Sequence, residues 1–112
     1  MILYNKTKNL IISSNIDVAD SFLKRLFGLI LKKNPPSDYG LMIPHCISVH
    51  SCFMSFTIDV VFTNRDMMVI DIITLKPWRF SKIYFCSENV FEFRAGFVYD
   101  KISIGDLIEI KG

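Results

Sequence analysis

Four side chains that commonly bind transition metals lie near the middle of the sequence, namely His45, Cys46, His50 and Cys52. Imidazole nitrogens and thiolates are usual zinc ligands, and each must lie within about 2.0–2.3 Å of the ion. In an extended strand, Cys46 and His50 would be roughly 13 Å apart, because each residue adds about 3.3 Å. The sequence also has no C-x-x-C or H-x-x-H pair. We therefore expect no metal and no cofactor, and interpret Cys46 and Cys52 as small core residues.

His50 and Asp59 could act together as a base and the carboxylate that orients it. Along one straight strand they would be about 30 Å apart and on opposite faces, but a corner at Ser55–Thr57 would let them approach. No nucleophile with flanking glycines accompanies them, as an elbow-type hydrolase requires. We therefore expect Asp59 to accept backbone N–H groups at the corner. A small enzyme that uses His50 with Asp59 or Glu92 as acid and base is the alternative hypothesis.

Trp78 and Arg79 follow Pro77, so they are expected in a turn. An exposed Trp-Arg pair is a common anchor for a protein or peptide partner. The competing interpretation places Trp78 over the end of the sheet, with Arg79 paired to an acid such as Glu92. We favour this second arrangement for Trp78, because tryptophan is mostly buried on average.

Most of the chain has the period of two that is typical of strands. One helix is expected to start at Asp20, a good N-cap residue, with Phe22 and Leu26 on its apolar face. Asn64–Asp66 is expected to form a tight hairpin loop, and Gly96 and Gly105 to mark turns with positive φ. Nine segments are predicted as strands, the first two as a hairpin: 2–4, 10–13, 41–43, 48–54, 58–63, 67–74, 82–85, 90–93 and 107–110. The fold class is therefore mainly β, a small β-sandwich or partly open β-barrel with one short helix.

Even and odd positions differ sharply between Cys52 and Thr63. The even positions through Phe62 are apolar, whereas the odd positions 55, 57, 59 and 63 are polar. This alternation indicates a half-buried strand. The predicted core contains Met54, Ile58, Val60, Phe62 and either Phe53 or Phe56, covered by Phe22 and Leu26 of the helix.

Length, composition and charge exclude several classes of protein. The 112 residues suffice for one domain, and a hydrophobic fraction of 51% excludes intrinsic disorder. Thirteen basic and eleven acidic residues are too balanced to indicate a nucleic-acid partner. No signal peptide and no run of about 20 apolar residues is present, so we expect a cytoplasmic protein without a membrane partner. A monomer is favoured, and the three cysteines are expected to be free thiols.

Five motifs in order resemble a known family. The run from His50 to Phe62, HSCFMSFTIDVVF, is similar to the pattern H-T-x-x-M-x-F-P-I-D-V-V-F of the bacterial and archaeal family called domain of unknown function 192. The family patterns R-x-x-G-L-M, L-x-P-W-R, V-L-E-L-P-A-G and G-D resemble RLFGLI at 25–30, LKPWR at 75–79, VFEFRAG at 90–96 and GD at 105–106. The match covers nearly the whole chain and implies a single domain over residues 1–112.

This sequence departs from the family pattern at three positions. Ile30 replaces Met, Thr57 replaces Pro, and Arg94 replaces Pro. These changes affect rigidity more than chemistry, although the loss of proline at position 57 alters the constraint on that turn. The resemblance implies a small all-β domain with no accepted activity. It therefore transfers no catalytic residues.

The residues favour a binding or accessory module, which recognises a protein segment or a small ligand. Its groove is predicted near His50, Asp59, Trp78 and Glu92, with Arg79 as a further candidate ligand-binding residue. No catalytic residue is assigned. The binding hypothesis predicts that truncation of Trp78 abolishes partner binding, whereas His50→Ala is largely silent. The enzyme hypothesis predicts the opposite: His50→Ala abolishes function and truncation of Trp78 does not.

Overall fold

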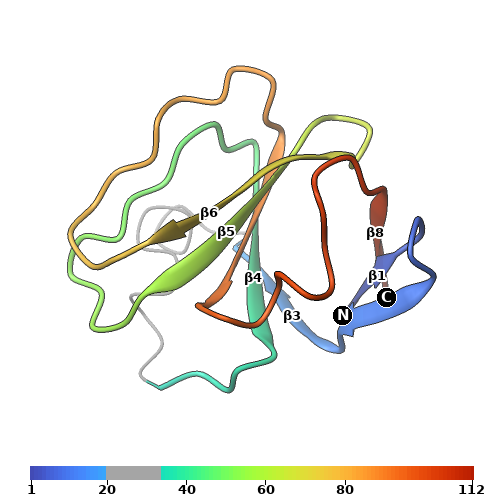
Figure 1. The fold of residues 1–112 in the computed structure, drawn as a ribbon, viewed down its shortest axis with the longest axis horizontal. Coiled ribbons are helices and arrows are strands. Elements are labelled where there is room, and N and C mark those ends of the chain that lie inside the picture. The colour runs from blue at the N-terminus through green and yellow to red at the C-terminus, as the bar shows by residue number, and fades with distance from the viewer. Residues whose placement is uncertain (20–33) are drawn as a thin grey trace.

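Eight short strands make up the fold in a computed structural model that describes residues 1–19 and 34–112 (Figure 1). One sheet has three strands in the order β2-β1-β8, and the other has five in the order β3-β4-β7-β5-β6. Both chain termini lie in the small sheet, where Ile2 pairs with Lys111 (Figure 1). The strands are β1 (Ile2–Asn5), β2 (Leu10–Ser13), β3 (Asn15–Val18), β4 (Tyr39–Pro44), β5 (Ile58–Thr63), β6 (Val69–Leu75), β7 (Asn89–Arg94) and β8 (Ile108–Lys111).

The predicted mainly β class is confirmed, and the two sheets do not close into a barrel. The predicted helix, with Asp20, Phe22 and Leu26, lies outside the described residues, and the residues that are described form no helix. Nowhere in the described ranges does a helix have the length and apolar character needed to cross a membrane.

The strand predictions succeed where the apolar alternation is long, and fail in short or irregular segments. The opening hairpin is confirmed, since β1 and β2 pair antiparallel. β3 was not predicted, because its sequence contains Asn15 and Asp17, residue types that are depleted in strands. It pairs parallel to β4 at one edge of the large sheet. The predicted strands at 48–54 and 82–85 are instead irregular loops.

β5 is buried along its whole length, with all six residues inaccessible. Ile58, Val60 and Phe62 face one apolar cluster, as predicted. Val61, on the other face, belongs to a second cluster. The prediction of a half-buried strand is therefore wrong, because the odd positions Asp59 and Thr63 are also fully buried.

Each face of the large sheet is covered by a different part of the chain. The small sheet covers the second cluster, to which it contributes Leu3, Ile12 and Ile108. The first cluster is covered by two loops, which contribute Val49 and Met54 from one and Tyr84 from the other. The loops are thus a structural layer as well as connections.

The predicted core is confirmed for Met54, which is 6% exposed, and for the even residues of β5. Phe56 is the aromatic residue that packs against this cluster, where it is partly buried. Phe53 points away, with 70% of its surface exposed. Its backbone φ of 68° turns the chain at this point, which breaks the strand alternation used for the prediction.

Replacing Phe62 by alanine tests the first cluster. The ring is 0% exposed and stacks on Tyr84 with ring centroids 4.0 Å apart. Its removal should lower the free energy of unfolding by about 3–5 kcal/mol, measured by urea denaturation. The control is Phe80→Ala, because Phe80 is 74% exposed and its truncation should cost less than about 0.5 kcal/mol. A loss below about 1 kcal/mol for Phe62→Ala would contradict this assignment of the core.

Candidate functional site

The structure does not bring the predicted site residues into one groove. Asp59 and Glu92 are inside the large sheet, where they are 0% and 3% exposed. Asp59 lies opposite Thr74 and Phe93 in the sheet, whereas Glu92 lies opposite Leu41 and Val60. Side chains of directly paired residues share a face. Since Phe93 belongs to the second cluster and Val60 to the first, the two carboxylates point to opposite faces of the sheet.

Asp59 has a structural set of partners. Its Oδ1 accepts the Thr74 hydroxyl at 2.7 Å, and its Oδ2 accepts the backbone N–H of Gly96, also at 2.7 Å. The sequence predicted that Asp59 accepts backbone N–H groups at the 55–57 corner. The backbone N–H that it accepts is in the loop after β7 instead. Gly96 has a φ of 93°, the positive value that its turn was predicted to need. The carboxylate thus ties β5 to β6 and to the loop after β7.

His50 lies in the loop after β4, half-buried, on a segment that packs against the first cluster through Val49 and Met54. Its Nδ1 accepts the backbone N–H of Cys52 at 3.2 Å, and its backbone bridges antiparallel to Phe80. Asp59 faces the second cluster, so His50 and Asp59 are not placed as a catalytic pair.

The metal-binding residue types are dispersed. His45 Nδ1 lies 2.7 Å from the carboxylate of Glu88, and Cys46 packs at the edge of the first cluster. Within residues 1–19 and 34–112, no three side chains of His, Cys, Asp or Glu are grouped so that they could hold a metal ion. The three cysteines are free thiols, and Cys86 is exposed.

Two loops, residues 46–57 and 76–87, run side by side and are called here the loop pair (Figure 1). Four backbone hydrogen bonds join them like an irregular antiparallel ladder, one of them from the N–H of Trp78 to the carbonyl of Ser51 at 3.0 Å. The N–H of Tyr84 donates to the carbonyl of Ile47 at 2.8 Å, and that of Ser81 to Val49 at 2.9 Å. The N–H of Ser51 donates to the carbonyl of Arg79 at 2.8 Å.

Ser51 connects the two loops from inside. Its side chain is 0% exposed, and its hydroxyl donates to the carbonyl of Lys76 at 2.5 Å. The same oxygen accepts the backbone N–H of Arg79 at 2.9 Å, while the Ser51 carbonyl accepts that of Trp78 at 3.0 Å. Sequence reasoning missed this residue. The available signal was its place directly after His50, where the family pattern has threonine, which also carries a hydroxyl.

The outer side of the loop pair exposes a row of large apolar side chains. Five of them are more than half exposed: Phe53 at 70%, Trp78 at 56%, Phe80 at 74%, Ile83 at 53% and Phe85 at 82%. Trp78 therefore does not pack over the end of the sheet as predicted. Arg79 is also exposed, and its guanidinium donates to the carbonyl of Trp78 at 3.3 Å instead of pairing with Glu92. Isolated exposed apolar residues are ordinary, but five within two paired loops are an unusual concentration.

The rings of Phe53 and Trp78 meet across the two loops, with centroids 4.6 Å apart. Both residues have positive φ, 68° and 65°, a region that bulky residues rarely adopt. Such a conformation costs of order 1–3 kcal/mol and persists where the surroundings impose it, commonly at functional sites. Hydrogen bonds to Ser51 hold both turns: its carbonyl accepts the N–H groups of Trp78 and Met54, and its hydroxyl oxygen accepts that of Arg79.

An open hollow of about 800 Å³ adjoins the far end of the loop pair. Phe85 forms part of its wall, so the exposed row of the loop pair continues into it. The β5–β6 turn contributes Arg65 and Asp66, and the segment before β7 contributes Glu88. Asn64–Asp66 is the predicted tight turn, in which Asn64 Oδ1 accepts the N–H groups of Asp66 and Met68, each at 3.0 Å.

Over residues 1–19 and 34–112, two β-sheets and a covering layer of paired loops define a small, mainly β domain in which His50 and Asp59 lie apart. The chain belongs to the DUF192 family, described as an uncharacterized ACR, whose model matches residues 3–110.

Archaeal relatives support this placement, and a solved structure shows a similar fold. The chain is 40% identical over 81 residues to a UPF0127 protein of Pyrococcus horikoshii, covering 69% of this chain and 70% of that protein. It is 30% identical to a UPF0127 protein of Pyrococcus abyssi, covering 96% of each chain. A protein of unknown function from Novosphingobium aromaticivorans has a similar fold, with a TM-score of 0.77 at 14% identity, over 97% of this chain and 82% of that one.

Ser51→Ala tests the connection between the loops. The change leaves the carbonyl of Lys76 and the N–H of Arg79 without their buried hydroxyl partner. The free energy of unfolding should fall by about 1–3 kcal/mol, the usual penalty for unsatisfied buried polar groups. Ser48→Ala, at an exposed position of the same loop, is the control and should stay within about 0.5 kcal/mol of the parent. Equal stability of the two variants in urea denaturation would contradict the role of Ser51.

Tyr84 makes stability depend on pH in the alkaline range. Partial burial and the hydrogen bond to Asp71 raise the pKa of Tyr84 from 10.0 to about 12. Because the folded state favours the neutral phenol, this stabilisation is complete below pH 10 and is lost as the pH rises toward about 12. Tyr84→Phe should therefore flatten the decline of the unfolding free energy above pH 10. Urea denaturation of parent and variant at several alkaline pH values measures this, and identical slopes would contradict it.

Proposed function

We propose that this chain is a binding module whose recognition surface is the outer side of the loop pair. The observation that carries the proposal is the exposed row of large apolar side chains on a scaffold that is rigidly tied from within. Its inner side is fixed by the buried Ser51 and by Val49 in the core. Aromatic side chains and arginine are the residue types that supply most binding energy at protein interfaces. Trp78 and Arg79 therefore keep the anchoring role considered for them from the sequence.

The proposed site differs from the groove predicted from the sequence. It keeps Trp78 and Arg79, with His50 at its base, and adds Phe53 and Phe80. Asp59 and Glu92 are excluded from it because they are buried within the sheet.

The geometry gives no support to the enzyme hypothesis. Both oxygens of Asp59 are held by Thr74 and Gly96 on the face that the small sheet covers. Glu92 is 3% exposed in the middle of β7, where a substrate would have no access to its carboxylate. A general acid or base has to come within hydrogen-bond reach of the substrate. The binding hypothesis needs no such assembly.

Trp78 gives a direct test, because it is the only tryptophan in the chain and reports binding by its fluorescence. Peptides selected from a random displayed library against the whole chain should change the emission of Trp78. Trp78→Ala should then weaken binding roughly tenfold or more, measured by calorimetry, since a central aromatic anchor contributes about 2 kcal/mol. His50→Ala should leave the affinity nearly unchanged, because this half-buried side chain is bonded to the backbone N–H of Cys52 within its own loop.

Ile11→Ala is the matched control, since Ile11 on β2 has the same exposed fraction as Trp78, 56%. It should leave the affinity unchanged. Circular dichroism checks that each variant is folded. Selected peptides that bind Trp78→Ala as tightly as the parent, or a library that yields no binder, would contradict the proposed function.

A further inference from the structure

The loop pair carries a distinct charge. Residues 46–57 and 76–87 contain Lys76, Arg79 and Lys82 and not a single Asp or Glu. The rest of the chain has ten basic and eleven acidic residues, so it has a net charge of −1 while the loop pair has +3. The net positive charge of the chain is therefore carried by the loop pair.

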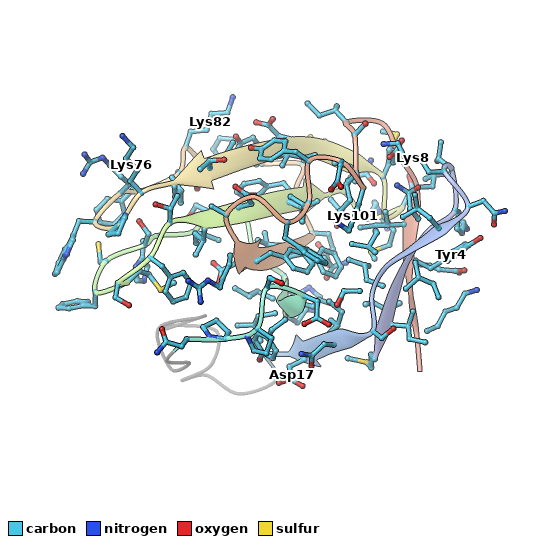
Figure 2. The ribbon with its side chains drawn as sticks, turned by 60° about the horizontal axis from the view of Figure 1, so that its bottom comes forward. Tyr4, Lys8, Asp17, Lys76, Lys82 and Lys101 are labelled. Atoms are coloured by element: carbon cyan, nitrogen blue, oxygen red, sulfur yellow. The ribbon has the colours of Figure 1, made fainter. Side chains whose placement is uncertain are left out.

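The three cations are available to a partner. All three are exposed, and among the described residues none forms an ion pair with a carboxylate. Lys82 lies over the ring of Tyr84, with Nζ 4.9 Å from the centroid, and Arg79 contacts the carbonyl of Trp78. In Figure 2, Lys76 lies toward the end of the molecule away from Tyr4 and Lys8, and Lys82 projects from the upper edge.

Resting on the proposed function, we infer that the loop pair binds an extended acidic protein segment, with apolar side chains that contact the exposed rings. Complementary charge steers such a segment to the surface and sets its orientation. Residues 78–85 span at most roughly 23 Å, the length of about seven extended residues. Alternate side chains of an extended segment point the same way, so acidic and apolar side chains can meet the cations and the rings in turn.

The hollow at the far end favours a protein segment over a phosphate-bearing partner. Its lining includes the carboxylates of Asp66 and Glu88 beside Arg65. A membrane surface or a nucleic-acid strand presents negative charge continuously, and would meet these carboxylates next to Phe85. A protein segment can place its acidic residues over Lys76 to Lys82 and a neutral or basic side chain in the hollow. Three exposed cations also give only weak neutralisation of a phosphate backbone.

Three synthetic peptides of roughly ten residues test the inference, a length that covers the loop pair. The first alternates Asp with Leu and Phe, the second replaces each Asp by Asn, and the third replaces each Asp by Lys. The acidic peptide should bind at least about tenfold more tightly than the other two, with a change in Trp78 fluorescence, and its affinity should fall as salt is added.

Charge reversal identifies the surface. Lys76→Glu and Lys82→Glu should each weaken binding of the acidic peptide about three- to tenfold at low ionic strength, as expected for exposed charge pairs. Lys6→Glu changes the net charge equally in the exposed turn between β1 and β2, and should have little effect. Equal effects of all three variants would overturn the location, because they would show that only net charge matters.

The remaining outcomes separate this inference from the proposed function. If the Asn peptide binds as tightly as the acidic one and Trp78 still reports it, the acidic preference is overturned while the binding module stands. If no designed peptide changes the Trp78 signal, the acidic preference is overturned, and the library selection alone decides whether the binding module stands. Vesicles of phosphatidylserine with phosphatidylcholine, and oligothymidylate, are tested in parallel. A stronger Trp78 response to either than to the acidic peptide would overturn the choice of a protein partner.

Discussion

Burial of both faces of β5 is the constraint on which the rest of the structure depends. A strand in the middle of a sheet has two faces, and each needs a covering layer when both carry apolar side chains. The small sheet supplies one layer through Leu3 and Ile108. No second sheet covers the other face in the described part of the chain, where the loop pair supplies Val49, Met54 and Tyr84 instead. The loops are held in place because their inner side chains are packed into the first cluster.

A loop can serve as a core layer only if its backbone polar groups find partners. The loop pair meets this requirement through four backbone hydrogen bonds between its two loops and through the side-chain hydroxyl of Ser51. The buried polar groups of β5 are treated in the same way, since Asp59 bonds to Thr74 and Gly96, and Thr63 to the carbonyl of Asn89. Each partner comes from another element, so these bonds join the layers as well as satisfying individual groups.

The features that could be predicted from the sequence are those that depend on neighbouring residues in the chain. The bounds of β5, the Asn64–Asp66 turn and the positive φ of Gly96 each depend on residues adjacent in the chain. The burial of Asp59 could not be predicted in this way. The alternation of residue types shows only that position 59 is polar, and the two partners that allow its burial, Thr74 and Gly96, lie 15 and 37 residues away in the sequence. For Trp78, the average burial of its residue type gave the wrong answer. Its exposure is decided by a backbone turn that Ser51, in another loop, holds in place.

The same architecture explains how the loop pair can expose so many large side chains. In a regular strand, consecutive residues alternate between core and solvent, and a covering strand would bury half of its aromatic residues. The positive φ at Phe53 and at Trp78 breaks this alternation and turns both rings outward, where they contact each other. The inner residues of the same loops meanwhile remain in the core. Core packing therefore holds the surface rigid in advance, which reduces the ordering cost of binding a partner. This is the physical link between a strand buried on both faces and the proposed recognition surface on the loop pair.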